Sequence, residues 1–181
     1  MQDKLLLDWN QVNKLTLELV RSITISGWIP DRIVALDRGG LTLGVMISHY
    51  FKIPFTSLSV RLRDSDACCE SNLDLPQLAL GYFHPMDGDD AQKEPPPKQN
   101  ILIVDDINDT GATIQWIKED WRKSCVPNSP EWNHVWHNNV RFAALIHNES
   151  STSPIDYASM DINKAEQDVW VVFPWEHWWA I

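Results

Sequence analysis

Residues 101–113 read ILIVDDINDTGAT, and this stretch decides the fold. Its first four residues are apolar and mostly β-branched, which predicts a short strand buried on both faces. Three acids follow: Asp105, Asp106 and Asp109. Apolar residues then recur at helical spacing: Ile114, Ile117 and Trp121. The segment therefore predicts a strand, a loop and a helix, and ligands of open α/β sheets bind beyond such strand ends.

The composition of this loop suits a sugar phosphate. Amides that open the next helix point toward a phosphate, the helix dipole favours negative charge there, and Gly111 allows a close approach. Carboxylates repel phosphate, so the acids make sense if they accept hydrogen bonds from sugar hydroxyls or hold a metal that the phosphates also ligate. The plain alternative is a strand-to-helix turn in which Asp and Thr cap the helix.

Residues 101–113 resemble the phosphoribosyl pyrophosphate loop of the type I phosphoribosyltransferases. The resemblance implies an α/β fold, with a central and mostly parallel sheet, helices on both faces and a small hood built from the chain termini. It implies that Asp105 and Asp106 hold the ribose hydroxyls and, through them or water, Mg²⁺. Asp109 would share a proton at the imidazole nitrogen of a purine. The residues implied to cradle the 5′-phosphate are Asp109, Thr110, Gly111, Ala112 and Thr113.

Length and charge limit the function classes. The 181 residues predict a single domain, 1–181, and the net charge of −10 argues against nucleic acid or anionic membrane as partner. No apolar run approaches the ~20 residues of a membrane span, and the N-terminus lacks a signal pattern. Three cysteines offer no disulfide framework. We expect a cytoplasmic homodimer or homotetramer that binds small-molecule substrates.

Hydrophobic periodicity predicts helices that alternate with strands, which favours a parallel sheet with helices on both faces. Helices are predicted at 8–25, at 41–51 and from the site loop to about 123. The other predicted strands are 32–36, 55–62, 140–146 and 169–173. Between residues 63 and 99 the pattern gives way to Gly, Pro and acids. We expect a long mobile loop at 64–99 that orders over bound substrate.

A second candidate loop, Asp37-Arg38-Gly39-Gly40, follows the predicted strand 32–36. Its glycines allow unusual backbone angles, and its arginine carries forked donors suited to phosphate oxygens. A glycine turn with a surface arginine is the alternative. In 6-oxopurine members of the family the matching loop binds pyrophosphate and often contains a non-proline cis peptide, which would fall between Asp37 and Arg38. Arg61 or Arg63, at the root of the long loop, could add positive charge.

Residues 168–176, DVWVVFPWE, resemble the base-binding segment of bacterial xanthine-guanine phosphoribosyltransferases, within a hood at 148–181. The resemblance implies that Trp170 stacks on the purine and that the main chain of Val171 contacts the edge bearing the 2-position. Glu176 would lie near that edge or bind a second metal. Stacking and backbone polar groups together fix the orientation of a flat heterocycle. The other C-terminal tryptophans suit a core or a subunit contact instead: Trp175, Trp178 and Trp179.

One position departs from the family pattern. In 6-oxopurine enzymes a lysine after the strand that matches 142–146 donates a hydrogen bond to the 6-oxygen of the base. In this sequence the residue at the matching position is Asn148, or, with a poorer alignment, His147. A neutral amide is a weaker donor, so we expect weak binding of the base and tighter binding in Asn148→Lys. Asp109 still favours a 6-oxopurine, because adenine, uracil and orotate members lack an acid at that position.

The function predicted from these features is transfer of 5-phosphoribose from phosphoribosyl pyrophosphate to hypoxanthine, guanine or xanthine. The reaction releases pyrophosphate, requires Mg²⁺ and serves purine salvage. Two alternatives remain: a non-catalytic regulator that senses phosphoribosyl pyrophosphate or a nucleotide, and a transferase for another base such as a pyrimidine.

Overall fold

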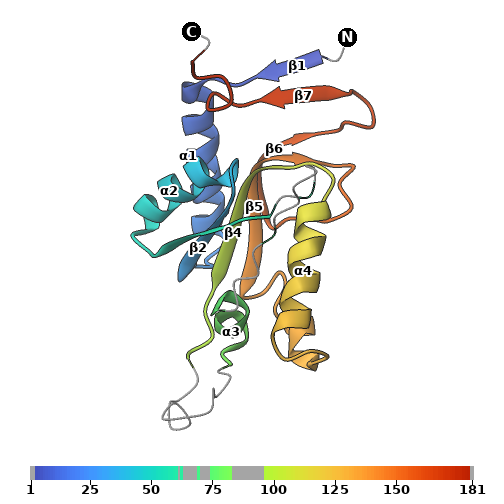
Figure 1. Ribbon diagram of the computed structural model, residues 1–181. Coiled ribbons are helices and arrows are strands. Elements are labelled where there is room, and N and C mark those ends of the chain that lie inside the picture. The colour runs from blue at the N-terminus through green and yellow to red at the C-terminus, as the bar shows by residue number, and fades with distance from the viewer. Residues whose placement is uncertain (1–2, 61, 63–68, 70–73, 83–95, 180–181) are drawn as a thin grey trace.

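The computed structural model describes residues 3–60, 62, 69, 74–82 and 96–179. Five parallel strands form the central sheet of this part of the chain, in the order β3-β2-β4-β5-β6 (Figure 1). The strands are β2 (Arg32–Leu36), β3 (Phe55–Leu58), β4 (Ile101–Asn108), β5 (Val140–Asn148) and β6 (Tyr157–Ile162). Because all five run the same way, their carboxyl ends share one edge, where ligands of such sheets bind.

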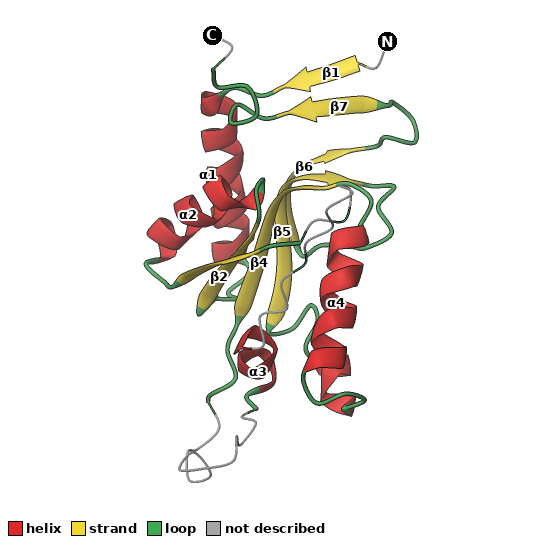
Figure 2. Ribbon diagram, viewed as in Figure 1, coloured by secondary structure: helices red, strands yellow, loops and turns green. Residues whose placement is uncertain are grey.

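Helices α1 (Trp9–Ile25) and α2 (Gly40–Phe51) cover one face of the sheet (Figure 2). Asp8 begins α1 through a capping box: its carboxylate accepts from the Gln11 amide at 2.7 Å, and the Gln11 side chain accepts from the Asp8 amide at 2.8 Å. The apolar stripe of α1 is buried against β5 and β6 together with side chains of α2. This burial, more than local propensity, holds both helices in place.

The opposite face is covered by α3 (Asp74–Leu80), α4 (Ala112–Ser124) and the short 3₁₀ helix η2 (Pro130–His134). Trp121 of α4 and Trp132 of η2 are buried there, and the Trp132 indole donates to the Cys125 carbonyl at 3.0 Å. Trp136 stacks on Trp132 with ring centroids 5.6 Å apart. Several of the many tryptophans therefore serve the core.

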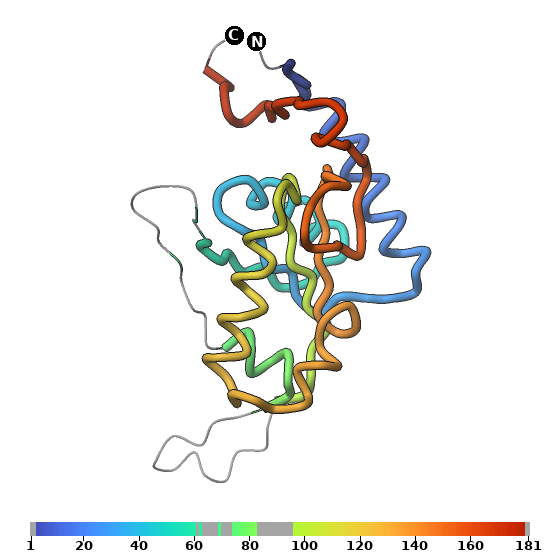
Figure 3. Tube along the Cα trace, turned by 90° about the vertical axis from the view of Figure 1, so that its right-hand side faces the viewer, coloured from blue at the N-terminus to red at the C-terminus, as the bar shows by residue number. Residues whose placement is uncertain are grey.

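A separate pair of parallel strands, β1 (Asp3–Leu6) and β7 (Val169–Val172), forms the hood predicted from the chain termini. It lies beyond the edge of the sheet at which β4 turns into α4, and both termini emerge there (Figures 1 and 3). Phe173 is buried beneath it and stacks on Trp175 at 4.8 Å. Trp178 and Trp179 are 65% and 66% exposed, so they do not belong to the core of this chain.

The predicted fold class is confirmed, and each predicted helix and strand is present: β2 has the predicted ends, and the ends of the others are shifted. Four elements were not predicted from the sequence: β1, α3, η2 and β6. Because β6 pairs with β5 inside the central sheet, the predicted hood boundaries of 148–181 are too wide. The described helices include none that is both long and apolar enough to cross a membrane.

The expectation of an irregular segment throughout 64–99 is wrong for 74–80, where α3 forms. Leu75 and Ala79 of α3 are buried against the sheet face that α4 also covers. The Asn139 amide donates to the Ala79 carbonyl at 2.8 Å and to the Gln99 carbonyl at 3.0 Å, which ties α3 and residue 99 to the residue before β5. Most of the predicted lid lies outside the described part of the chain, as do Arg61 and Arg63.

We expect Leu75→Ala to destabilise the protein by about 2–4 kcal/mol, because it opens a cavity beside a buried side chain. Leu17→Ala, the same substitution at a half-exposed position of α1, is the control and should change the free energy of unfolding by less than about 0.5 kcal/mol. Urea unfolding of both variants measures the difference. Equal midpoints would show that α3 does not pack as described.

Candidate functional site

Strand β4 carries the acids further into the sheet than the sequence predicts. The strand was expected to end at Val104, yet it continues to Asn108, because β5 lies alongside and pairs with it as far as His147. Asp105 and Asp106 are consequently strand residues, and both are partly buried. The prediction that they belong to the loop after the strand is wrong.

The carboxyl ends of β2 and β4 open into a cavity of about 530 Å³. Most predicted site residues line it: Arg38, Gly39, Asp105, Asp106, Asp109, Thr110, Gly111, Ala112, Thr113 and Glu176. Asn148, Trp170 and Val171 are not part of this lining, and Arg63 lies outside the described residues. The structure thus joins the two predicted loops and one acid of the hood in a single site.

The loop from Asp109 to Thr113 turns into α4 at Gly111. Gly111 has φ of +84°, and a β-carbon there would lie only 2.6 Å from the Ser153 amide nitrogen. The N-cap residue Gly111 has no side chain to cap α4, and no Asp caps the helix within the described structure; the Thr110 hydroxyl accepts from the Ala112 amide at a long 3.4 Å. The first turn of α4 lines the cavity, and the amide donors at a helix start favour a bound phosphate.

A hydroxyl-rich stretch, 150–153, supports this loop from behind and was missed in the sequence. The Thr152 amide and hydroxyl donate to the Thr110 carbonyl at 3.1 and 2.8 Å, and the Ser153 hydroxyl donates to the Gly111 carbonyl at 3.2 Å. The run Ser-Ser-Thr-Ser was the available signal. These bonds engage the carbonyls of Thr110 and Gly111 and fix the loop against residues 152 and 153.

The second loop approaches the first closely. The peptide bond between Asp37 and Arg38 is cis, as the family resemblance implied. Gly39 has an ordinary negative φ, but a β-carbon at this position would collide with the Asp106 carboxylate. A larger residue here would therefore displace the Asp106 carboxylate, whereas Arg38 extends into the exposed part of the cavity.

Asp106 lies in an electrostatically unfavourable position. Burial raises the pKa of its carboxyl from 3.8 to about 6, and the Glu176 carboxylate adds to the rise, while a hydrogen bond from the Ile107 amide opposes it. Glu176 comes from the hood, where its Oε1 accepts from the Phe173 amide at 3.3 Å. The cavity therefore holds a concentration of negative charge that favours a cation or a hydroxyl donor.

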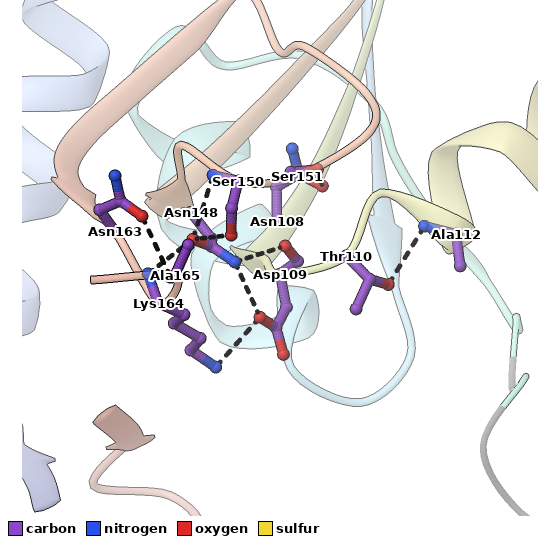
Figure 4. A network of polar contacts seen from close by, with 10 residues as sticks. All are labelled: Asn108, Asp109, Thr110, Ala112, Asn148, Ser150, Ser151, Asn163, Lys164 and Ala165. Atoms are coloured by element: carbon purple, nitrogen blue, oxygen red, sulfur yellow. Dashed lines mark hydrogen bonds and ion pairs between the residues drawn. The ribbon is translucent and has the colours of Figure 1, made fainter. Parts of the chain in front are cut away.

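Asn148 does not have the role predicted for it. Its side chain is buried, its Nδ2 donates to the carbonyl and carboxylate of Asp109 at 3.0 and 3.4 Å, and its Oδ1 accepts from Ser150 and from the Lys164 amide (Figure 4). An amide with donors and acceptor already engaged cannot also bind a base. His147, the second candidate, instead contacts the Asn108 amide at 3.0 Å.

The same network contains a residue that the sequence did not indicate. The Lys164 ammonium lies 3.0 Å from an Asp109 carboxylate oxygen, although Lys164 follows β6 in an irregular segment (Figure 4). In the hood, Trp170 is 46% exposed, and Val171 is buried with its main chain in β7. An exposed indole is available for stacking, so the predicted contact of Trp170 with a base stays a prediction.

Several known proteins resemble the chain along nearly its whole length. It is 20% identical to the hypoxanthine-guanine phosphoribosyltransferase of Schizosaccharomyces pombe, over 96% of this chain and 89% of that protein. It is 24% identical to the xanthine-guanine phosphoribosyltransferase of Idiomarina loihiensis, over 93% and 84%. The crystal structure of the purine phosphoribosyltransferase from Pyrococcus horikoshii shares its fold, with a TM-score of 0.62, 24% identity and coverage of 96% and 94%.

The phosphoribosyl transferase domain family matches residues 5–179, a range that includes both cavity loops, the whole central sheet and all of the hood except the start of β1. The chain therefore belongs to the phosphoribosyl transferase domain family.

Proposed function

We propose that the protein is a Mg²⁺-dependent purine phosphoribosyltransferase that transfers 5-phosphoribose from phosphoribosyl pyrophosphate to a 6-oxopurine. One observation carries this proposal: the paired acids of β4, the amides that open α4 and the Arg38-Gly39 loop line the same cavity. Ribose hydroxyls, a 5′-phosphate and a pyrophosphate require these three kinds of partner side by side. The relatives named as purine phosphoribosyltransferases agree with it.

In the proposed reaction a purine nitrogen replaces pyrophosphate at ribose C1′. The bond from C1′ to the pyrophosphate oxygen breaks, a bond from C1′ to nitrogen forms, and positive charge builds on the ribose, as it does in glycoside hydrolysis. Asp105 and Asp106 accept hydrogen bonds from the ribose hydroxyls and present negative charge to this cation. Asp109 accepts the proton that the purine imidazole releases.

The binding loops orient the two phosphate groups. Residues 109–113 hold the 5′-phosphate on the open first turn of α4, and Arg38 with the Gly39 amide holds the pyrophosphate. Both loops line the cavity that contains the acid pair, so they would hold the two phosphate groups of phosphoribosyl pyrophosphate with the ribose beside Asp105 and Asp106. Positioning of this kind accounts for a large part of catalysis in group transfer.

The donor set also fits Mg²⁺. Among the described residues no three His, Cys, Asp or Glu side chains gather as a ready metal site, but Mg²⁺ keeps several waters and binds through one or two carboxylates plus substrate phosphates. The raised pKa of Asp106 beside Glu176 marks a position where a cation relieves charge repulsion. Asp105, Asp106 and Glu176 are the residues that would hold it, and it would supply charge neutralisation to the departing pyrophosphate.

The direct test is pyrophosphate release from phosphoribosyl pyrophosphate, with Mg²⁺ and a panel of purines and pyrimidines. We expect turnover with at least one 6-oxopurine. Binding of phosphoribosyl pyrophosphate without turnover of any base would identify the protein as a sensor, and turnover restricted to pyrimidines or adenine would refute the substrate assignment.

Asp105→Asn and Asp106→Asn should each lower kcat/KM by about 100-fold or more while the fold is retained, because each removes charge that the ribose cation requires. Circular dichroism and thermal melting check the fold beside the activity. Asp161→Asn, at an exposed position of β6, is the control and should leave kcat/KM unchanged. Near-normal rates in both β4 variants would contradict the roles assigned to them.

Asp106 should also reduce stability at neutral pH. The folded pKa of about 6 lies above the unfolded value of 3.8, so the folded state binds the extra proton, and stability falls as pH rises through this window. Asp106→Asn removes the effect and should raise Tm at pH 7.5 by about 4–10 °C. At pH 4 the two proteins should melt alike. A variant that melts at or below the wild-type temperature at pH 7.5 would contradict the buried charge.

Gly111→Ala should raise the KM for phosphoribosyl pyrophosphate by about tenfold or more, because both the positive φ and the proximity of Ser153 displace the phosphate loop. Gly27→Ala is a matched control, since Gly27 also has positive φ but open space around its α-carbon, at the end of α1. Gly27→Ala should lose about 1 kcal/mol of stability and Gly111→Ala more than that, and only Gly111→Ala should lose affinity. Equal KM values would exclude the loop as the phosphate site.

A further inference from the structure

Lys164 is not part of the cavity lining, but its ammonium is held beside Asp109, which is. Its backbone amide donates to the Asn148 Oδ1 at 3.0 Å, and the following turn is closed by Asn163, whose Oδ1 accepts from the Ala165 amide at 3.1 Å (Figure 4). Asn148 at the same time donates to Asp109. A single buried amide therefore ties the end of β5 to the loop after β4 and to the segment after β6.

This arrangement places one cation against the acid proposed to meet the base. The Lys164 and Asp109 side chains are 18% and 20% exposed, and their charged atoms are 3.0 Å apart. An ammonium group has three N–H donors, of which the ion pair with Asp109 uses one, so two can serve a ligand. Partial burial makes the remaining donors stronger than they would be in open solvent.

We propose that Lys164 is a specificity-determining residue that donates a hydrogen bond to the exocyclic 6-oxygen of the purine. The inference rests on the proposed function and assigns a part of that site. Purine N7 and the 6-substituent share one edge of the ring. Asp109 and Lys164 together present an acceptor next to a donor, which matches an imidazole N–H beside a carbonyl oxygen.

The same pair selects against adenine. Its 6-amino group is a donor, and an ammonium group has no lone pair with which to accept. Two donors would then face each other at a partly buried edge, and such an unpaired contact lowers affinity. Lys164 therefore takes the role first predicted for Asn148, which is to bind the 6-substituent of the purine. Because Lys164 is a charged donor, the weak binding of the base that a neutral Asn148 implied is no longer predicted.

Binding of product nucleotides tests the inference without requiring turnover. Calorimetry would compare inosine and adenosine monophosphates on the wild type, on Lys164→Met and on Lys123→Met. Lys123 is the matched control: it forms an exposed ion pair on α4 with Glu119 at 3.2 Å, and Glu119 does not line the cavity, whereas Asp109, the partner of Lys164, does. Melting temperature and affinity for phosphoribosyl pyrophosphate report on the fold of each variant, and Lys164→Gln provides a second neutral substitution.

We expect Lys164→Met and Lys164→Gln to lower the affinity for inosine monophosphate by about 10- to 100-fold, as loss of a charge-assisted hydrogen bond does. Affinity for adenosine monophosphate should stay the same or rise, and Lys123→Met should change neither. If Lys164 had a purely structural role, its substitution would lower the affinity for both nucleotides equally, and that result would overturn the inference. Unchanged affinity of the variants for inosine monophosphate would also overturn it, as would a wild type that binds neither nucleotide.

The outcomes separate the two proposals. A wild type that binds inosine monophosphate through Lys164 but never releases pyrophosphate would refute the proposed catalytic function and leave the specificity role intact. A wild type that turns over 6-oxopurines while Lys164→Met keeps the same preference between nucleotides would refute the specificity role alone.

Discussion

The Asp106 carboxylate lies directly against Gly39, and the rest of the site depends on this contact. It joins the loop after β2 to the acid pair of β4, two neighbouring strands whose carboxyl ends share an edge of the parallel sheet. A side chain at residue 39 would displace the Asp106 carboxylate, which is proposed to bind the ribose hydroxyls. Pyrophosphate and ribose sites must lie within one substrate's length of each other, and this small residue lets the loop after β2 lie against the acid pair.

The second constraint is electrostatic. Asp106 is partly buried near Glu176, and both burial and the second carboxylate disfavour its charged form. The raised pKa of Asp106 reflects this unfavourable free energy. Nothing in the packing requires a carboxylate there, so the position is better explained by what it binds than by stability. Sites that bind cations or stabilise developing positive charge often carry such unfavourable groups, and ligand binding offsets the cost.

The base edge of the site is organised by a structural amide rather than by a direct contact. Asn148 uses its hydrogen bonds to hold Asp109 and the backbone of Lys164 together. A lysine side chain at residue 148 could not accept the bonds that the Asn148 Oδ1 accepts, so it would dismantle this arrangement rather than improve it. In this chain the cation comes from the segment that joins the central sheet to the hood.

The sequence alone determined the fold class, most of the helices and strands, and the loops that line the cavity. These features are local: periodicity of apolar residues, glycine-rich turns and a continuous motif from Ile101 to Thr113. Only the tertiary structure decided that β4 runs on to Asn108, since that extension comes from pairing with β5. It also decided that β6 and α3 form, because tertiary contacts outweigh their weak local patterns. The ion pair between Lys164 and Asp109, 55 residues apart in the sequence, also results from tertiary packing. Residue spacing along the chain does not predict such a contact.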